Sequence, residues 1–151
     1  MIKFINKTSL IDEINFIQEG GMRTKGLIKK DVVNKPLFSI ITVVKNSAHT
    51  LEKTINSVIN QSYKNIEYIV IDGGSTDNTL KIIRKYSNII NVLVSEQDSG
   101  LYDAMNKGIS LATGDVIGLI NSDDLFCDQD ALNKVAKVFE KNENLDSVYA
   151  D

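Results

Sequence analysis

The fold is decided by residues 37–47, which read LFSIITVVKNS. Residues 37–44 are almost all apolar and rich in β-branched side chains, whereas residues 45–47 are polar. A strand that is apolar on both faces is typical of a parallel sheet with helices covering both sides. The stretch therefore predicts a central strand with a polar loop at its carboxyl end.

The same alternation continues towards the end of the chain. Strand patterns at residues 66–71, 91–94 and 115–120, and a last one starting near Ser147, are separated by helical patterns. The helical patterns cover residues 51–59, 80–86, 101–112 and 131–139, and Asp77 is the expected N-cap of the second. Strands that alternate with helices of this length indicate βαβ units, so the predicted class is α/β.

Residues 1–36 are predicted to form an appendage outside this sheet. Apolar residues recur there at the spacing of a short amphipathic helix, at Leu10, Ile11, Ile14 and Ile17. A basic stretch then leads to the only proline, Pro36. We interpret the basic stretch as a solvated linker, with contact to anionic lipid or a partner as the alternative. The domain boundary is therefore expected at residue 37, with a ligand-binding domain over residues 37–151.

Composition excludes several classes of function. The 151 residues carry a net charge of −3 and no basic block, which argues against a nucleic-acid binder. One cysteine and one histidine cannot build a Cys/His zinc site, so a metal would need oxygen ligands. Because no apolar run approaches a membrane span and no hydrophobic signal core is present, we expect a cytoplasmic protein.

Polar and acidic residues gather where the predicted strands end, at residues 45–47, 72–77, 96–103 and 121–124. In an open α/β sheet, ligands bind beyond the carboxyl ends of the strands. The phosphate fingerprints G-x-G-x-x-G and G-x-x-x-x-G-K-S/T are both absent, which argues against nicotinamide and P-loop enzymes. These loops predict an acidic ligand site on one rim of the sheet.

Two motifs on this rim each allow two interpretations. The adjacent carboxylates of Asp123 and Asp124 could hold Mg²⁺ or Mn²⁺, or could lie in a solvated turn in which Asp124 or Asp128 caps the next helix. Asp72, followed by two glycines, could bind a nucleobase or a ribose hydroxyl, or could close a tight strand-to-helix turn.

Candidate nucleophiles are few. His49 is interpreted as a surface residue near a helix start, and Cys127 as a small buried residue.

The order of these motifs resembles family 2 glycosyltransferases of the GT-A fold. The resemblance spans residues 37–151 and is carried by residues 39–46, 50–58, 61–62, 67–77 and 121–124. The run SGLYDAMNKG at residues 99–108 is similar to a bacterial subgroup that acts in cell-surface polysaccharide assembly. The resemblance as a whole implies a Rossmann-like, mostly parallel GT-A sheet flanked by helices. It also implies that residues 37–151 are the donor-binding half of a longer enzyme.

The resemblance further implies a nucleotide-diphosphate sugar donor, a saccharide or lipid-linked acceptor, and Mg²⁺ or Mn²⁺. Asp124 becomes the expected metal ligand, with Asp123 at the ribose or in the outer shell of the metal. The remaining residues implied for donor binding come from all the strand-end loops and one helix: Thr42, Val43, Val44, Asn46, Asp72, Asp98, Gly100, Asn106 and Lys107.

In relatives, the catalytic base comes from a segment beyond the last acidic loop. We therefore expect that residues 1–151 alone bind the donor but transfer no sugar. Asp103 is the one internal acid that could serve as the base, although a helix-start position explains it more simply. The rival functions are a non-catalytic nucleotide-sugar-binding module and a nucleotidyltransferase. An enzyme of the predicted kind could also contact the inner face of the membrane peripherally.

Overall fold

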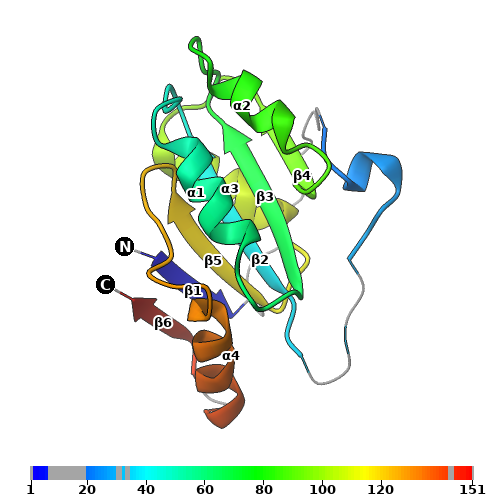
Figure 1. Ribbon diagram of the computed structural model, residues 1–151, viewed down its shortest axis with the longest axis vertical. Helices are drawn as coiled ribbons and strands as arrows, with labels where there is room; N and C mark the ends of the chain where they lie inside the picture. Colours follow the sequence, from blue (N-terminus) through cyan, green and yellow to red (C-terminus); the bar gives the residue numbers. More distant parts are fainter. Residues whose placement is uncertain (1, 7–19, 30–31, 33–34, 143–144, 151) are drawn as a thin grey trace.

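The computed structural model describes residues 2–6, 20–29, 32, 35–142 and 145–150. Within these residues a six-stranded sheet has the order β4-β3-β2-β5-β1-β6 (Figure 1). The strands are β1 (Ile2–Asn6), β2 (Phe38–Val44), β3 (Ile66–Asp72), β4 (Val92–Ser95), β5 (Val116–Asn121) and β6 (Ser147–Ala150). Strands β2 to β5 pair in parallel, whereas β1 is antiparallel to both β5 and β6. The predicted α/β class and the last strand from Ser147 are confirmed.

Helices cover both faces of the sheet, as Figure 1 shows for α1 and α2 in front and α3 behind. They are α1 (Leu51–Ile59), α2 (Thr79–Lys85), α3 (Leu101–Leu111) and α4 (Ala131–Lys141), and a single 3-10 turn, η1, spans Arg23–Lys25. Successive side chains of a strand point to opposite faces, so β2 sends Ile40 into the core under α1, α2 and α4 and Ile41 into the core under α3. Strands buried on both faces explain the continuous apolar runs in the sequence.

Helix α3 lies unusually close to the sheet. A Cβ added to Gly108 would stand 2.4 Å from Cγ2 of Ile41, so only glycine lets the helix approach β2 this closely. The close approach fixes the position of α3, whose first turn belongs to the site described below.

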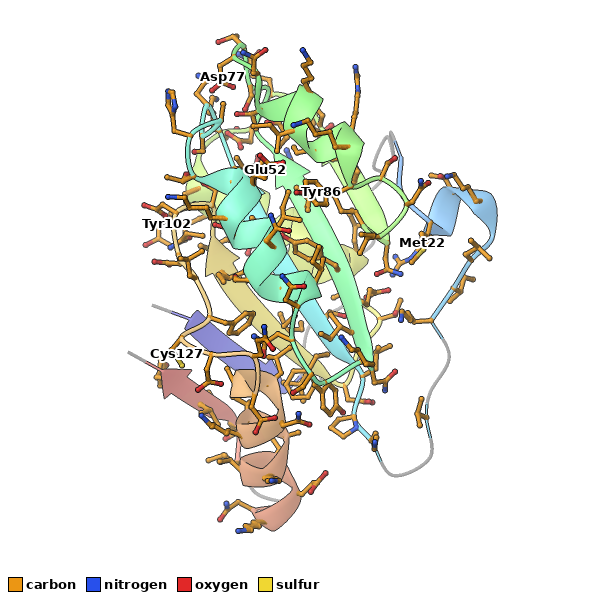
Figure 2. The ribbon with its side chains drawn as sticks, in the orientation of Figure 1. Met22, Glu52, Asp77, Tyr86, Tyr102 and Cys127 are labelled. Carbon is orange, nitrogen blue, oxygen red and sulfur yellow. The ribbon has the colours of Figure 1, made fainter. Side chains whose placement is uncertain are left out.

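The N-cap of α2 is Asn78, so the prediction of Asp77 as the N-cap is wrong by one residue, although the Asp77 side chain still supports the start of the helix. Helix α2 begins at Thr79, and Oδ1 of Asp77 accepts the Thr79 backbone N–H at 2.9 Å. Hydrogen bonds from the hydroxyl and backbone of Thr79, and from the backbone of Ala48, hold the pKa of Asp77 below its usual value. Asp77 stands at the tip of the loop before α2 in Figure 2 and joins this loop to the one after β2.

The prediction that residues 1–36 stand apart from the sheet is wrong in two places. Residues 2–6 form β1, which lies inside the sheet between β5 and β6. Residues 20–23 follow the outer edge of β4, where Arg23 N–H donates to the carbonyl of Asn91 at 2.9 Å. No local pattern indicates these pairings, because the partners lie far apart along the chain. The helix predicted from Leu10, Ile11, Ile14 and Ile17 lies outside the described residues.

Arg23 also reaches a buried carboxylate at the amino end of the sheet. Glu67, only 1% exposed, accepts hydrogen bonds from the Arg23 guanidinium, the Ser39 hydroxyl and both donors of Thr113. Burial alone would raise the pKa of Glu67, but the hydrogen bonds from Ser39 and Thr113, together with the charge of Arg23, lower it below the usual value. Segment 20–26 is therefore joined to the sheet by a charged interaction as well as by backbone bonds.

Candidate functional site

The site lies at the carboxyl edge of the parallel strands. Register places Val44 beside Asp72, Asp72 beside Ser95, and Val43 beside Asn121, so the loops that follow these strands start at one level. A cavity of about 470 Å³ opens among three of these loops and the first turn of α3. It is lined by Val43, Val44, Lys45, Ser47, Asp98, Gly100, Leu101, Ala104, Asn121, Ser122 and Asp123.

Asp98 is a nearly buried acid on the cavity wall, with its side chain 6% exposed. Its Oδ1 accepts the Gly100 backbone N–H at 3.2 Å, and its Oδ2 lies where Gly73 has no side chain. A Cβ at residue 73 would stand 2.1 Å from this oxygen. Gly73 therefore makes room for a carboxylate delivered by the loop after β4.

Lys45 brings a cation to the same wall. Its Nζ lies 3.7 Å from Oδ1 of Asp98, and half of its side chain is exposed. At this distance the two charges attract each other without a close hydrogen bond. The cavity wall thus combines a half-exposed donor, Lys45, with a nearly buried acceptor, Asp98.

The two adjacent acids after β5, Asp123 and Asp124, have different surroundings. Asp123 is exposed and lines the cavity. Asp124 is not among the lining residues, and its Oδ2 accepts a hydrogen bond from the Asn121 side-chain amide at 3.1 Å. The geometry favours Asp123 as the carboxylate that faces a ligand, with Asp124 shaping the loop.

Two hydroxyl groups position this acidic loop. The Thr54 hydroxyl, fully buried in α1, lies 2.9 Å from the carbonyl oxygens of both Ser122 and Asp124. The Ser122 hydroxyl donates to the Ser47 hydroxyl at 3.0 Å, which links the loops after β5 and β2. The loop that carries Asp123 is therefore held by the first helix of the domain.

Three of the predicted donor-binding residues do not line the cavity. Thr42 is buried and shares a hydrogen bond with the Tyr68 hydroxyl at 3.0 Å. Asn46, in the left-handed conformation at φ 51°, accepts the Thr76 N–H at 2.8 Å. Asp72 is fully buried and accepts hydrogen bonds from Ser75 and Ser95. These contacts agree with the turn interpretation of Asp72.

The two predicted residues on α3 also lie away from the cavity. Asn106 is exposed on the surface of the helix, and Lys107 pairs with Glu96 at 2.9 Å and with Asp103 at 3.1 Å. Burial alone would lower the pKa of Lys107, but the two carboxylates raise it. Asp103 accepts the Ser99 backbone N–H, and this bond and the bond from Lys107 lower its pKa. A carboxylate stabilised in this way is a weak base, as the helix-start interpretation expects.

Other expectations can be compared with the structure directly. Five of the predicted donor-binding residues line the cavity, Val43, Val44, Asp98, Gly100 and Asp123. That they bind a donor stays a prediction. Six lining residues were missed as site residues, although all six lie at a strand end, in the loop after it or in the helix that follows: Lys45, Ser47, Leu101, Ala104, Asn121 and Ser122.

Of the predictions for the two candidate nucleophiles, one is confirmed and one is wrong. His49 is exposed just before α1, as expected. Cys127 is exposed, so the prediction that it is buried is wrong. It lies on the loop between β5 and α4 (Figure 2), where its Sγ is 3.7 Å from Oδ2 of Asp128. The sequence could not show this exposure, because Cys127 lies in a loop that has no repeating apolar pattern.

The residues on the wall fit a hard divalent cation in their chemistry. Asp123, Asn121 and Ser122 offer oxygen ligands, and Mg²⁺ commonly takes one or two carboxylates while water and substrate phosphates complete its shell. Across the described residues, three or more Asp, Glu, His or Cys side chains do not gather in a metal-binding group. Any cation here would therefore share its coordination with the ligand.

A parallel sheet with an acid-lined cavity at the carboxyl ends of its strands is the arrangement of the GT-A glycosyltransferases, and the structural neighbours of this chain belong to that fold. The chain belongs to Glycosyl transferase family 2, whose family model matches residues 39–150.

Two characterised relatives illustrate this membership. The chain is 36% identical over 119 residues to a PGL/p-HBAD biosynthesis glycosyltransferase of Mycobacterium bovis (strain BCG / Pasteur 1173P2), which covers 77% of this chain and 46% of that protein. It is 36% identical over 116 residues to the chondroitin synthase of Pasteurella multocida (strain Pm70), which covers 76% of this chain and 12% of that protein. The chain thus spans about half the length of the first relative and far less of the second.

Two solved structures show the same fold. The mannosyltransferase PcManGT from Pyrobaculum calidifontis, in complex with GDP-Man and Mn²⁺, matches with a TM-score of 0.66 and 25% identity over 71% of this chain and 33% of its own. S. aureus TarS 1-349 in complex with UDP-GlcNAc matches with a TM-score of 0.64 and 27% identity over 70% of this chain and 32% of its own.

A search of the described helices finds none with the length and apolar character needed to cross a membrane.

Proposed function

We propose that the cavity binds a nucleotide-diphosphate sugar together with Mg²⁺ or Mn²⁺, as the donor site of a glycosyltransferase of polysaccharide biosynthesis. The observation that carries this proposal is the position of Asp123 on the wall of a cavity built from strand-end loops. The PcManGT complex with GDP-Man and Mn²⁺ and the TarS complex with UDP-GlcNAc support it, because both proteins share this fold.

Each residue on the wall has a proposed role. Asp123 holds the cation, and Asp124 keeps Asp123 in place through its hydrogen bond to Asn121. When bound, the metal would act as a Lewis acid for the charge that develops on the departing nucleoside diphosphate. Asp98 accepts hydrogen bonds from the nucleoside, while Lys45 offers a positive charge to its polar oxygens. The assignment of the metal to Asp123 replaces the expected assignment to Asp124.

Among the residues described, we find no base for the acceptor side of the reaction. Asp103 is tied to Ser99 and Lys107, so we propose that the base which takes the acceptor proton comes from outside residues 1–151. The acceptor, a saccharide or a lipid-linked saccharide, and the cytoplasmic location stay predictions. So does the expectation that residues 1–151 alone transfer no sugar, which a product assay with nucleotide sugars and both types of acceptor would test.

Calorimetric titration with UDP and GDP, each with and without Mn²⁺, tests donor binding. We expect the wild type to bind at least one nucleotide far more tightly with Mn²⁺ than without it. Asp123→Ala should abolish the metal-dependent part, because it removes the carboxylate on the cavity wall. Asp128→Ala is the matched control, since Asp128 lies on the same loop but pairs with Lys134 outside the cavity.

The outcomes separate the possible assignments. If Asp124→Ala abolishes the metal effect while Asp123→Ala leaves it, the original assignment to Asp124 is right and ours is wrong. If the wild type binds neither nucleotide, the donor-site proposal fails. A nucleotide-sugar-binding module without catalysis would bind the donor but would form no glycoside in a longer chain that contains the acceptor side.

A further inference from the structure

A second surface with its own chemistry lies at the amino edge of the sheet, away from the donor cavity. It is formed by the strap, which we define as residues 20–29 with Val32 and Lys35, and by the neighbouring ends of α1 and α2. Figure 1 shows the strap on the far side of the molecule from β1 and β6. No residue of the strap lines the donor cavity.

The strap carries aliphatic side chains that face solvent. Leu27 is 57% exposed, Ile28 63% and Val32 49%, and Ile89 after α2 is 44% exposed. Large aliphatic side chains exposed singly are common, but Leu27 and Ile28 are neighbours in the chain, and Val32 and Ile89 line two cavities that share residues. Exposed aliphatic side chains gathered in this way favour an apolar contact.

Lysines surround these aliphatic side chains. Lys29, Lys35 and Lys64 line one cavity of about 370 Å³, together with Val32. Lys25 lies beside the patch, where its Nζ donates to the Asn88 side chain at 3.1 Å. This concentration of positive charge stands out on a chain whose net charge is −3.

A second cavity of about 250 Å³ adjoins the first and shares Lys29, Tyr63 and Lys64 with it. Its wall is largely apolar and includes Met22, Val58 and Ile89. Met22, labelled on the strap in Figure 2, is one of the lining residues. Among the described residues, neither cavity is lined by an acidic side chain.

The strap is fixed to the domain at both ends. Met22 N–H donates to the Ile90 carbonyl at 2.9 Å, next to the bond from Arg23 to Asn91. At the other end, the Asn65 amide donates to the Lys35 carbonyl at 3.0 Å and the Tyr63 hydroxyl to the Pro36 carbonyl at 2.5 Å. The lysines and aliphatic side chains are thus presented on a supported backbone.

We infer that the strap binds the surface of a membrane that contains anionic phospholipid. Exposed aliphatic side chains enter the boundary between headgroups and acyl chains, while lysines attract the phosphate groups. The charge of the surface selects this occupant over a second copy of the same chain, because two such surfaces would repel each other. The inference concerns a different edge of the sheet and does not depend on donor binding.

Sedimentation with lipid vesicles tests the inference. The full chain should bind vesicles of phosphatidylcholine with 30% phosphatidylglycerol in low salt, and should bind pure phosphatidylcholine weakly. The triple variant Lys29→Gln, Lys35→Gln, Lys64→Gln should weaken binding about a hundredfold, because each lysine near an anionic surface contributes about fivefold. The double variant Leu27→Ser, Ile28→Ser, made in the wild-type chain, should also weaken vesicle binding, but the salt dependence of the remaining binding should not change.

A matched control has the same loss of charge elsewhere: Lys81→Gln, Lys137→Gln and Lys141→Gln, which are exposed on α2 and α4. Equal loss of binding in this control would overturn the inference, since net charge alone would then explain it. Equal binding of the wild type to both kinds of vesicle would overturn it too, as would a dimer in gel filtration that Leu27→Ser, Ile28→Ser dissociates. Thermal unfolding of each variant shows that lost binding does not come from lost structure.

Discussion

The amino and carboxyl ends of the parallel strands, here called the amino and carboxyl edges, both carry acids and a basic side chain, but these groups have different partners. At the amino edge, Glu67 is buried and every one of its hydrogen bonds comes from the protein: from Arg23, Ser39 and Thr113. At the carboxyl edge, Asp123 is exposed, and Lys45 lies 3.7 Å from Asp98 with half of its side chain in solvent. Glu67 is thus satisfied within the chain, whereas Asp123 and Lys45 present their charges to the cavity.

This difference shows how to tell a structural acid from a binding acid. Burial by itself does not distinguish them, because Glu67, Asp72 and Asp98 are all nearly or fully buried. The number of internal donors does: Glu67 and Asp72 have several, while Asp98 has one backbone N–H and a distant lysine. Substitutions at the two ends of the strands should therefore differ in effect, with loss of stability for the structural acid and loss of binding for the ligand-facing one.

Removing the acid at the amino edge should have the largest effect. Glu67→Ala leaves Arg23 and the donors of Ser39 and Thr113 without their acceptor, and loss of one partner of a buried ion pair costs about 3–5 kcal/mol. Urea unfolding should show a loss of this size in the free energy of unfolding, while Glu140→Ala, which removes an exposed acid, should change it little. A loss below about 1 kcal/mol would mean that the network is not a structural support.

Protonation of the same acid should remove a smaller part of the stability. Because the pKa of Glu67 in the folded protein is lower than its ordinary 4.5, its contribution is present above that pH and is lost as the pH falls through the folded value. The stability difference between wild type and Glu67→Gln should therefore shrink when unfolding is measured at decreasing pH below 4.5. A difference that is constant or grows would contradict the direction of the shift.

At the carboxyl edge, Gly73→Ala should weaken nucleotide binding. The new Cβ would overlap Oδ2 of Asp98, so the carboxylate must leave its place and the nucleotide loses a charged acceptor, at a cost of about 1–3 kcal/mol. Titration with UDP or GDP and Mn²⁺ measures this loss. Gly20→Ala is the control, since its nearest contact would be an ordinary 3.7 Å. Unchanged affinity in Gly73→Ala would place Asp98 outside the binding site.

The smallest effect is expected for Lys107, which belongs to the binding edge by sequence but is paired within the chain. Lys107→Met should reduce the free energy of unfolding by about 1 kcal/mol or less, because its partners Glu96 and Asp103 are partly exposed. The nucleotide affinity of Lys107→Met should equal that of the wild type. It should also equal that of the control Lys81→Met, which removes an exposed lysine on α2. A clear loss of affinity would support the prediction that Lys107 binds the donor.

Local patterns in the sequence predicted what depends on neighbouring residues. The alternation of apolar runs and helical spacing was enough to locate β2, β3, β4, β5 and the four α-helices, because each element buries its own pattern. The same logic located the site, since the strand-end loops of a parallel sheet meet at one edge.

What the sequence did not predict depends on side-chain direction and on distant pairing. Asp123 and Asp124 are neighbours with the same chemistry, and only the turn that joins Asp124 to Asn121 separates their roles. The approach of Asp98 to Gly73 joins two loops whose residues show no shared pattern. Likewise, Arg23 and Glu67 lie 44 residues apart in the sequence, so no local pattern showed their pairing and the linker interpretation missed it.

The position of β1 has a consequence for the order in which the protein folds. Lys3 of β1 pairs with Leu119 and Tyr149, which lie 116 and 146 residues further along the chain, and closing such loops slows folding. At ~5–20 residues per second, these partners are synthesised roughly 6 to 30 s after the strand. We therefore expect the parallel core to form first and the edge with β1 and β6 to close last, which makes that edge the slowest phase of refolding.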